Sequence, residues 1–208
     1  MRSALNLLVI FAGFSVLPVI AEVNDATEEL LEKLNPIQQL QGRFVQRQFD
    51  EQGEVLLESA GTFKLLRPAY FSWEIESPDR QLIIADTEFL WHYDMDLETV
   101  TRRPVDDSIE ASPLQVLAGD ASGLRDNYEV EQAANDSFVL LPRDSAQGFR
   151  ELTVHFTEQG LSQLDIVDRL GQQISVTLLE LDDASLLTPE TFVFEPPDSD
   201  VDIFYYDD

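Results

Sequence analysis

Residues 61–73 read GTFKLLRPAYFSW, and this stretch decides how the rest of the chain is interpreted. Two runs with apolar residues at every second position flank a single Arg67-Pro68 step, which is typical of two strands joined by a turn. Large apolar side chains gather on one face of each run: Phe63 and Leu65 on the first, and Phe71, Trp73 and Ile75 on the second. So much apolar surface on one side of a strand pair requires either a packed core or an apolar guest. The cation of Arg67 stands at the junction, where a core has no use for it.

The same alternation continues on both sides of this stretch. We predict strands at about 43–50, 55–66, 69–76, 81–86, 89–94, 98–104, 128–134, 137–142, 150–157, 161–168 and 172–181, and a last short strand over 192–194. An amphipathic helix with Leu30, Leu31 and Leu34 precedes them, and residues 112–118 read as a short helix with Pro113 at its first position. About eleven antiparallel strands with a few helices predict a mainly β (α+β) fold, in which one strongly curved sheet or partial barrel forms a single domain.

The N-terminal residues 1–21 have the composition of a signal peptide. Arg2 gives a basic start, residues 4–17 are almost all apolar, and Ala21 offers a small residue to a signal peptidase. The apolar run is too short for a comfortable membrane span, although an uncleaved anchor is the alternative. We therefore expect cleavage after Ala21 and export to the periplasm. The mature chain, residues 22–208, is expected to form one domain that ends in an acidic tail at about 198–208.

The chain is very acidic and contains no cysteine. It has 13 Lys and Arg against 40 Asp and Glu, a formal net charge of −27, which becomes −28 when Arg2 leaves with the signal. This charge argues against nucleic acid and anionic membrane surfaces as direct partners, because both would repel such a protein. The absence of cysteine excludes disulfides, thiol nucleophiles and the lipid-bearing cysteine of a bacterial lipoprotein. The acidity fits either a saline habitat or an acidic docking surface, and the sequence leaves both open.

Catalytic motifs are missing from the sequence. It contains no G-x-S-x-G, H-E-x-x-H, Walker or G-x-G-x-x-G pattern. The two histidines, His92 and His155, alternate with apolar residues, and we expect both on the opposite, wetter face of their strands. No enzyme activity, cofactor or metal is expected. A hydrolase acting on lipids or glycans stays an alternative, because carboxylates are too abundant for a catalytic pair to be excluded.

Five aromatic residues are the candidates for the wall of an apolar cavity: Phe44, Phe63, Phe71, Trp73 and Trp91. Each of them alone is more simply explained as part of a filled core. As a set they favour a cavity, because a curved sheet of this many strands encloses more volume than two or three short helices can fill.

The chain resembles the periplasmic carriers of outer-membrane lipoproteins, the LolA family. The resemblance runs from the first helix to Pro197 and depends on the order and spacing of several short motifs. These are Phe44-x-Gln46, Gly61-x-Phe63, Arg67-Pro68-x-x-Phe71-x-Trp73, Leu90-Trp91-x-Tyr93-Asp94, Ser112-Pro113, Leu141-Pro142, Asp168-x-x-Gly171-Gln172 and Phe192-x-Phe194-x-Pro196-Pro197.

The resemblance implies an incomplete antiparallel β-barrel whose apolar concave face is covered by a helical lid and binds acyl chains. It assigns Arg67 as a latch that bonds to lid carbonyls, and Pro113, Leu114 and Leu117 to the lid. It also implies a monomeric chaperone that takes acylated lipoproteins from an inner-membrane ABC-type exporter to an outer-membrane receptor. That receptor shares the fold and is an alternative identity, which the missing cysteine disfavours.

Overall fold

The computed structural model describes residues 26–105, 117, 121–144, 148–197 and 201–206. Its elements, in chain order, are α1 (Ala26–Leu34), β1 (Gln39–Phe49), β2 (Val55–Leu66), β3 (Tyr70–Ser77), β4 (Gln81–Ala85), β5 (Phe89–Asp94), β6 (Thr99–Pro104), α3 (Ala121–Asn127), β7 (Tyr128–Ala133), β8 (Ser137–Pro142), β9 (Phe149–Thr157), β10 (Gly160–Asp168), β11 (Gln173–Asp182), the 3-10 helix η1 (Pro189–Phe192) and β12 (Asp202–Tyr205). Eleven of the strands lie within about two residues of the predicted ranges, except that β1 begins four residues early.

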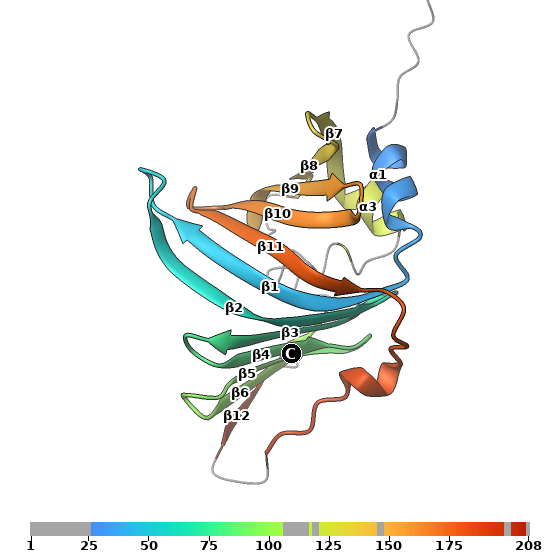
Figure 1. Ribbon diagram of the computed structural model, residues 1–208. Helices are drawn as coiled ribbons and strands as arrows, with labels where there is room; N and C mark the ends of the chain where they lie inside the picture. The colour runs from blue at the N-terminus through green and yellow to red at the C-terminus, as the bar shows by residue number, and fades with distance from the viewer. Residues whose placement is uncertain (1–25, 106–116, 118–120, 145–147, 198–200, 207–208) are drawn as a thin grey trace, which may run out of the picture.

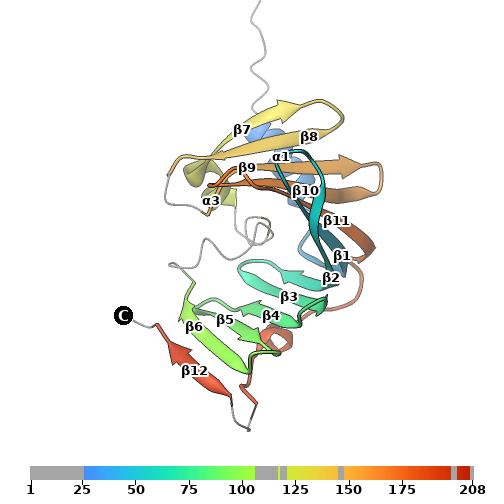
Figure 2. The same ribbon diagram turned by 90° about the vertical axis from the view of Figure 1, so that its left-hand side faces the viewer.

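Within the described residues these strands form one twelve-stranded sheet in the order β12-β6-β5-β4-β3-β2-β1-β11-β10-β9-β8-β7. β12 runs parallel to β6, and the other neighbours are antiparallel. The sheet curls strongly (Figure 1), and Figure 2 shows the curl in profile, with β7 and β8 at one end and β6 and β12 at the other. Because the two end strands do not pair, the barrel is incomplete, as predicted.

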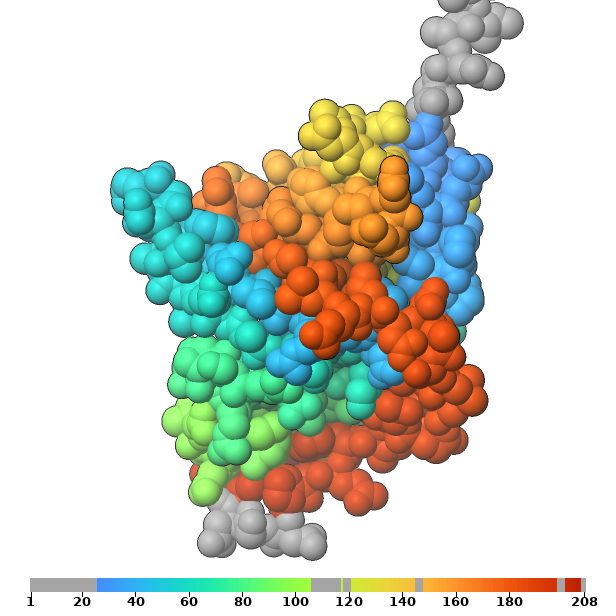
Figure 3. All heavy atoms as spheres, viewed as in Figure 1, coloured from blue at the N-terminus to red at the C-terminus, as the bar shows by residue number. Residues whose placement is uncertain are grey.

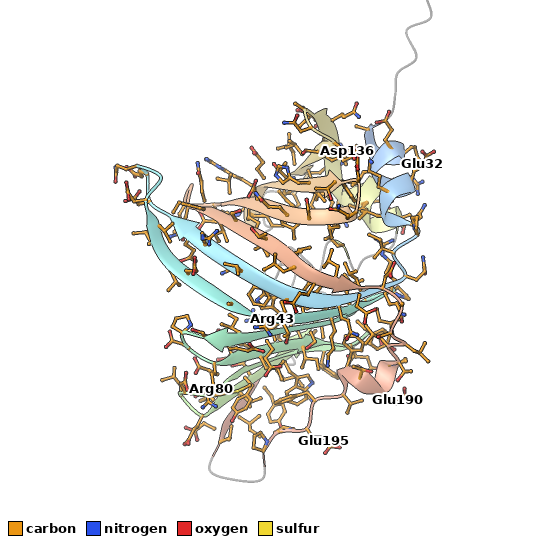
Figure 4. The ribbon with its side chains drawn as sticks, viewed as in Figure 1. Glu32, Arg43, Arg80, Asp136, Glu190 and Glu195 are labelled. Carbon is orange, nitrogen blue, oxygen red and sulfur yellow. The ribbon has the colours of Figure 1, made fainter. Side chains whose placement is uncertain are left out.

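Helices α1 and α3 cover one end of the concave face. Leu30, Leu31 and Leu34 of α1 are almost fully buried, which confirms the predicted stripe. The ammonium of Lys33 lies 2.8 Å from the carboxylate of Asp136, in the turn between β7 and β8 (Figure 4), so α1 is also tied to the sheet by charge. None of the described helices is long and apolar enough to cross a membrane.

The C-terminal segment covers the outside of the sheet. Phe192 and Phe194 pack against Tyr70 and Trp91, with ring centroids 5.6 and 5.3 Å apart. Glu190 and Glu195 mark the path of this segment below β3 to β6 in Figure 4, and Figure 3 shows it in red on the molecular surface. The predicted strand over 192–194 is wrong. Phe192 ends η1 and Phe194 follows it in irregular structure, and both contact the sheet through their side chains.

The edge of β6 is instead occupied by β12, which the sequence did not suggest. Its register pairs Asp202 with Thr99 and Tyr205 with Arg102. The segment predicted as an acidic tail therefore contributes a strand.

Gly61 is required by the close approach of β2 to β3. A Cβ atom placed on it would lie 1.8 Å from the carbonyl oxygen of Glu74, so the two strands could not keep their spacing. We expect Gly61→Ala to lower the free energy of unfolding by about 3 kcal/mol or more, since the clash is with backbone. Gly53→Ala is the matched control: it has open space but a φ of 82°, and should cost only about 1 kcal/mol. Urea unfolding measures both, and equal losses would contradict this account of Gly61.

Candidate functional site

The concave face carries apolar side chains in cross-strand rows. Directly paired residues of an antiparallel sheet point to the same side, so the strand register places them. One row reads Leu40, Leu65, Phe71, Ala85 and Leu90 across β1 to β5, and the next reads Gly42, Phe63, Trp73 and Ile83 across β1 to β4. Every member of the first row is at most 6% exposed. The prediction that residues 61–73 put one apolar face inward is confirmed.

Trp73 is the centre of an aromatic cluster on this face. Its ring stacks on Phe44, with centroids 3.5 Å apart and planes inclined by 17°. Phe63 and Phe71 lie 6.2 and 6.3 Å away. The structure therefore brings together four of the five predicted wall residues, all of them buried.

These aromatic rings form one continuous cluster with α1, α3 and Leu117. Leu117 is 2% exposed and belongs to this cluster, together with Leu124 of α3. The concave face is thus covered by parts of the same chain, and a guest could reach the aromatic rings only if some of that cover moved. Pro113 and Leu114, the other predicted lid residues, lie outside the described residues.

Arg67 connects the end of β2 to this cover. Its Nε–H donates a hydrogen bond of 3.0 Å to the carbonyl oxygen of Leu117, while its backbone N–H donates to Gln38. Burial lowers the pKa of the guanidinium, although an arginine stays charged at neutral pH. Its Nη2 is buried and has no hydrogen-bond partner in the structure as described. A cation in this position gains little from the fold except its bond to Leu117.

Trp91 lies on the other face of the sheet, so the prediction that it packs near Phe71 and Trp73 is wrong. It pairs in register with Ile84, which pairs with Ser72, and the alternation of β3 puts Ser72 opposite the aromatic wall. Its indole packs against Phe194, with ring centroids 5.3 Å apart. Period-two alternation showed which residues of β5 share a face but could not show which face the C-terminal segment covers.

The strand register also shows that the prediction for His92 is wrong. The prediction put it on the wetter, outer face, but it pairs with Ile83 and lies in the row of Trp73 on the concave face. Burial lowers its pKa, nearby Arg103 lowers it further, and Asp94 opposes both effects. Its Nε2 lies 3.2 Å from the amide oxygen of Gln81.

His155 lies on the outer face, in contact with a serine and an aspartate that sequence spacing did not connect to it. The hydroxyl of Ser137 is 2.8 Å from Nδ1 of His155, and Nε2 of His155 is 2.7 Å from Asp165. The arrangement resembles a catalytic triad, but Ser137 is only 3% exposed. We interpret it as a hydrogen-bonded chain that links β8, β9 and β10. Among the described residues no group of three or more His, Asp or Glu side chains could hold a metal ion.

Comparisons with known proteins agree with this architecture. The family model described as outer membrane lipoprotein carrier protein LolA matches residues 35–195. An outer-membrane lipoprotein carrier protein of Halorhodospira halophila is 36% identical over 94% of this chain and 95% of its own length. One from Alkalilimnicola ehrlichii is 33% identical over 92% and 90%. Among solved structures, a LolA superfamily protein from Nitrosomonas europaea has a TM-score of 0.50 at 11% identity, covering 81% of this chain and 97% of that one, which supports the fold alone.

We expect the hydrogen bonds that connect Ser137, His155 and Asp165 to stabilise the fold and to have no catalytic role. Ser137→Ala should lower the free energy of unfolding by about 1 kcal/mol, because a buried hydrogen bond is lost. Purified wild-type protein should hydrolyse p-nitrophenyl butyrate no faster than buffer. Ser162→Ala is the matched control, since its hydroxyl bonds only to the backbone oxygen of His155. Wild-type hydrolysis that disappears in Ser137→Ala alone would make this chain a catalytic site instead.

Proposed function

Because the chain belongs to the LolA family of outer-membrane lipoprotein carrier proteins, we propose that it is a periplasmic chaperone for lipoproteins. It binds their acyl chains after an ATP-driven exporter releases them from the inner membrane, and it delivers them to a receptor at the outer membrane. It acts as a monomer, uses no cofactor and catalyses no reaction. Residues 1–21 direct its export and are removed after Ala21.

A single observation carries this proposal: the apolar concave face is covered by α1, α3 and Leu117, and Arg67 donates a hydrogen bond to the Leu117 carbonyl. Each CH₂ group transferred from water to an apolar site gains about 0.8 kcal/mol, so an acylated protein needs a shielded route across an aqueous compartment. The aromatic rings around Trp73 offer such a surface once Leu117 moves away.

The same hydrogen bond explains how a bound lipoprotein can be released. Charge-assisted hydrogen bonds that are shielded from water are worth about 1.5–3 kcal/mol. Opening the cover sacrifices this bond, and closing restores it, so the closed, empty state competes with the loaded state. Net affinity for acyl chains is thereby reduced, and transfer to a receptor becomes favourable.

The direct test is to purify the mature protein from its own periplasm and to search for bound lipoprotein by mass spectrometry. We expect lipoproteins with intact acyl chains. We also expect that added protein releases lipoproteins from spheroplasts. Recovery of empty protein together with no release would refute the carrier function.

Replacement of Arg67 should separate loading from delivery. Arg67→Leu should still accept lipoprotein, but its delivery to a receptor should fall about tenfold, because the closed state is no longer favoured. Arg43→Leu is the matched control, since Arg43 lies on the surface of β1 in an ion pair with Glu76 (Figure 4). A transfer assay between purified carrier and receptor measures both variants. Normal delivery by Arg67→Leu would make Arg67 a simple turn residue.

Replacing one phenylalanine on each face of the sheet tests whether the concave face is the one that binds acyl chains. Phe71 and Phe192 are both at most 1% exposed, but they lie on opposite faces of the sheet. Phe71→Leu and Phe192→Leu should destabilise the protein by a similar amount, about 1 kcal/mol. Only Phe71→Leu should weaken binding of an acylated peptide, as measured by calorimetry. Equal binding losses would show that the effect comes from stability alone.

A further inference from the structure

The concave face changes from apolar to polar toward one edge of the sheet. The row of Leu65, Phe71, Ala85 and Leu90 ends on β6 at Arg103, and the row of Trp73 ends at His92 and Thr101. Figure 2 shows β5 and β6 near the end of the curl opposite β7, where the barrel is open. The apolar wall is therefore bordered, on its open side, by a cation and an imidazole.

Arg103 points to the concave side of the sheet, opposite to the preceding residue, Arg102. The guanidinium of Arg102 lies 4.2 Å from the ring centroid of Phe89 and 4.6 Å from that of Tyr205, on the outer face. Adjacent residues of a strand alternate between faces, so Arg103 faces inward. His92 pairs with Thr101, which precedes Arg103 by two residues on the same face, so the side chains of His92 and Arg103 are diagonal neighbours.

Arg103 is half-buried, and its side chain makes no ion pair or hydrogen bond with any residue that the structure describes. Five other cations of the described chain pair with carboxylates at 2.7–3.3 Å. The carboxylate of Asp94, on the same side of β5, accepts hydrogen bonds from the backbone of Asp96 and Leu97. The Asp94 carboxylate is thus hydrogen-bonded within the turn that follows β5.

We infer that Arg103 and His92 receive an anionic group of the acylated guest, whose hydrocarbon lies across β4 to β2 on the aromatic wall. This inference rests on the proposed carrier function and adds an orientation to it. Three strand spacings separate Arg103 from Phe71, about 14 Å, so head and chain occupy different parts of one face. A guanidinium binds phosphate or carboxylate oxygens in a bidentate manner. The anion is a phosphate head group or a carboxylate beside the acylated residue of the cargo.

The test compares two amphiphiles with the same chain, dodecyl phosphate and dodecyl maltoside, below their micellar concentrations. Wild-type protein should bind dodecyl phosphate about tenfold more tightly. Arg103→Gln should lose this preference and keep its affinity for the maltoside. Lys64→Gln is the matched control, because it removes one positive charge from the outer face and should keep the preference. Equal binding of both amphiphiles by the wild type, or an equal loss in Lys64→Gln, would overturn the inference. No binding of either amphiphile would contradict the proposed function itself.

The two histidines supply an independent readout by NMR. Bound dodecyl phosphate should raise the pKa of His92 by about one unit, whereas the ring signals of His155, on the outer face, should keep their chemical shifts. Arg103→Gln should raise the pKa of His92 in the free protein, because a nearby positive charge is removed. An unchanged His92 in both experiments would overturn the inference.

A second pair of ligands identifies the source of the anion. Diacylated peptides that carry Asp or Asn directly after the acylated cysteine test the cargo carboxylate, as dodecyl phosphate tests the head group. A preference that depends on Arg103 for the Asp peptide, the phosphate or both supports the site and names its source. A preference for neither overturns it.

Discussion

The apolar face around Trp73 must be kept from water, and the fold follows from this constraint. The chain has no disulfide to hold the sheet in place, so burial of apolar surface has to supply most of the stability. One side of the curled sheet is covered by α1, α3 and Leu117, and the outer side of β3 to β5 by the C-terminal segment. Of these two covers, the first is bonded at Leu117 to the half-buried Arg67.

Arg67 joins the end of β2 to the inner cover through a single side-chain hydrogen bond. This half-buried cation has one side-chain hydrogen bond to the cover, and its buried Nη2 has no hydrogen-bond partner among the described residues. Such a contact is strong enough to favour closure and weak enough for acyl burial to overcome it. The polar border at His92 and Arg103 adds a direction to the same surface. In the binding mode that we infer, a guest with one charged end is held in one orientation relative to this edge of the sheet.

Much of the fold could be predicted because period-two patterning and turn residues are local. The strands from β2 to β11 follow from alternation interrupted by Gly, Pro and Asp, and the α1 leucines from helical spacing. The strand β12 was missed, since its pairing with β6 depends on an edge that only the assembled sheet provides. The contact between Ser137, His155 and Asp165 was missed for the same reason, because it requires the register of three strands.

The sequence by itself determined which residues share a face, where the strands turn, and that Arg67 stands beside an apolar strand pair. It also carried the motifs by which the family was recognised. Only the tertiary structure decided which face of each strand points inward. Trp91 and His92 are adjacent, and alternation gives them opposite sides in either case. The outer side is covered by Phe194, about 100 residues further along the chain, and the concave side by α1, α3 and Leu117. Local spacing cannot encode that choice, because the free energy that makes it is gained only when distant segments pack together.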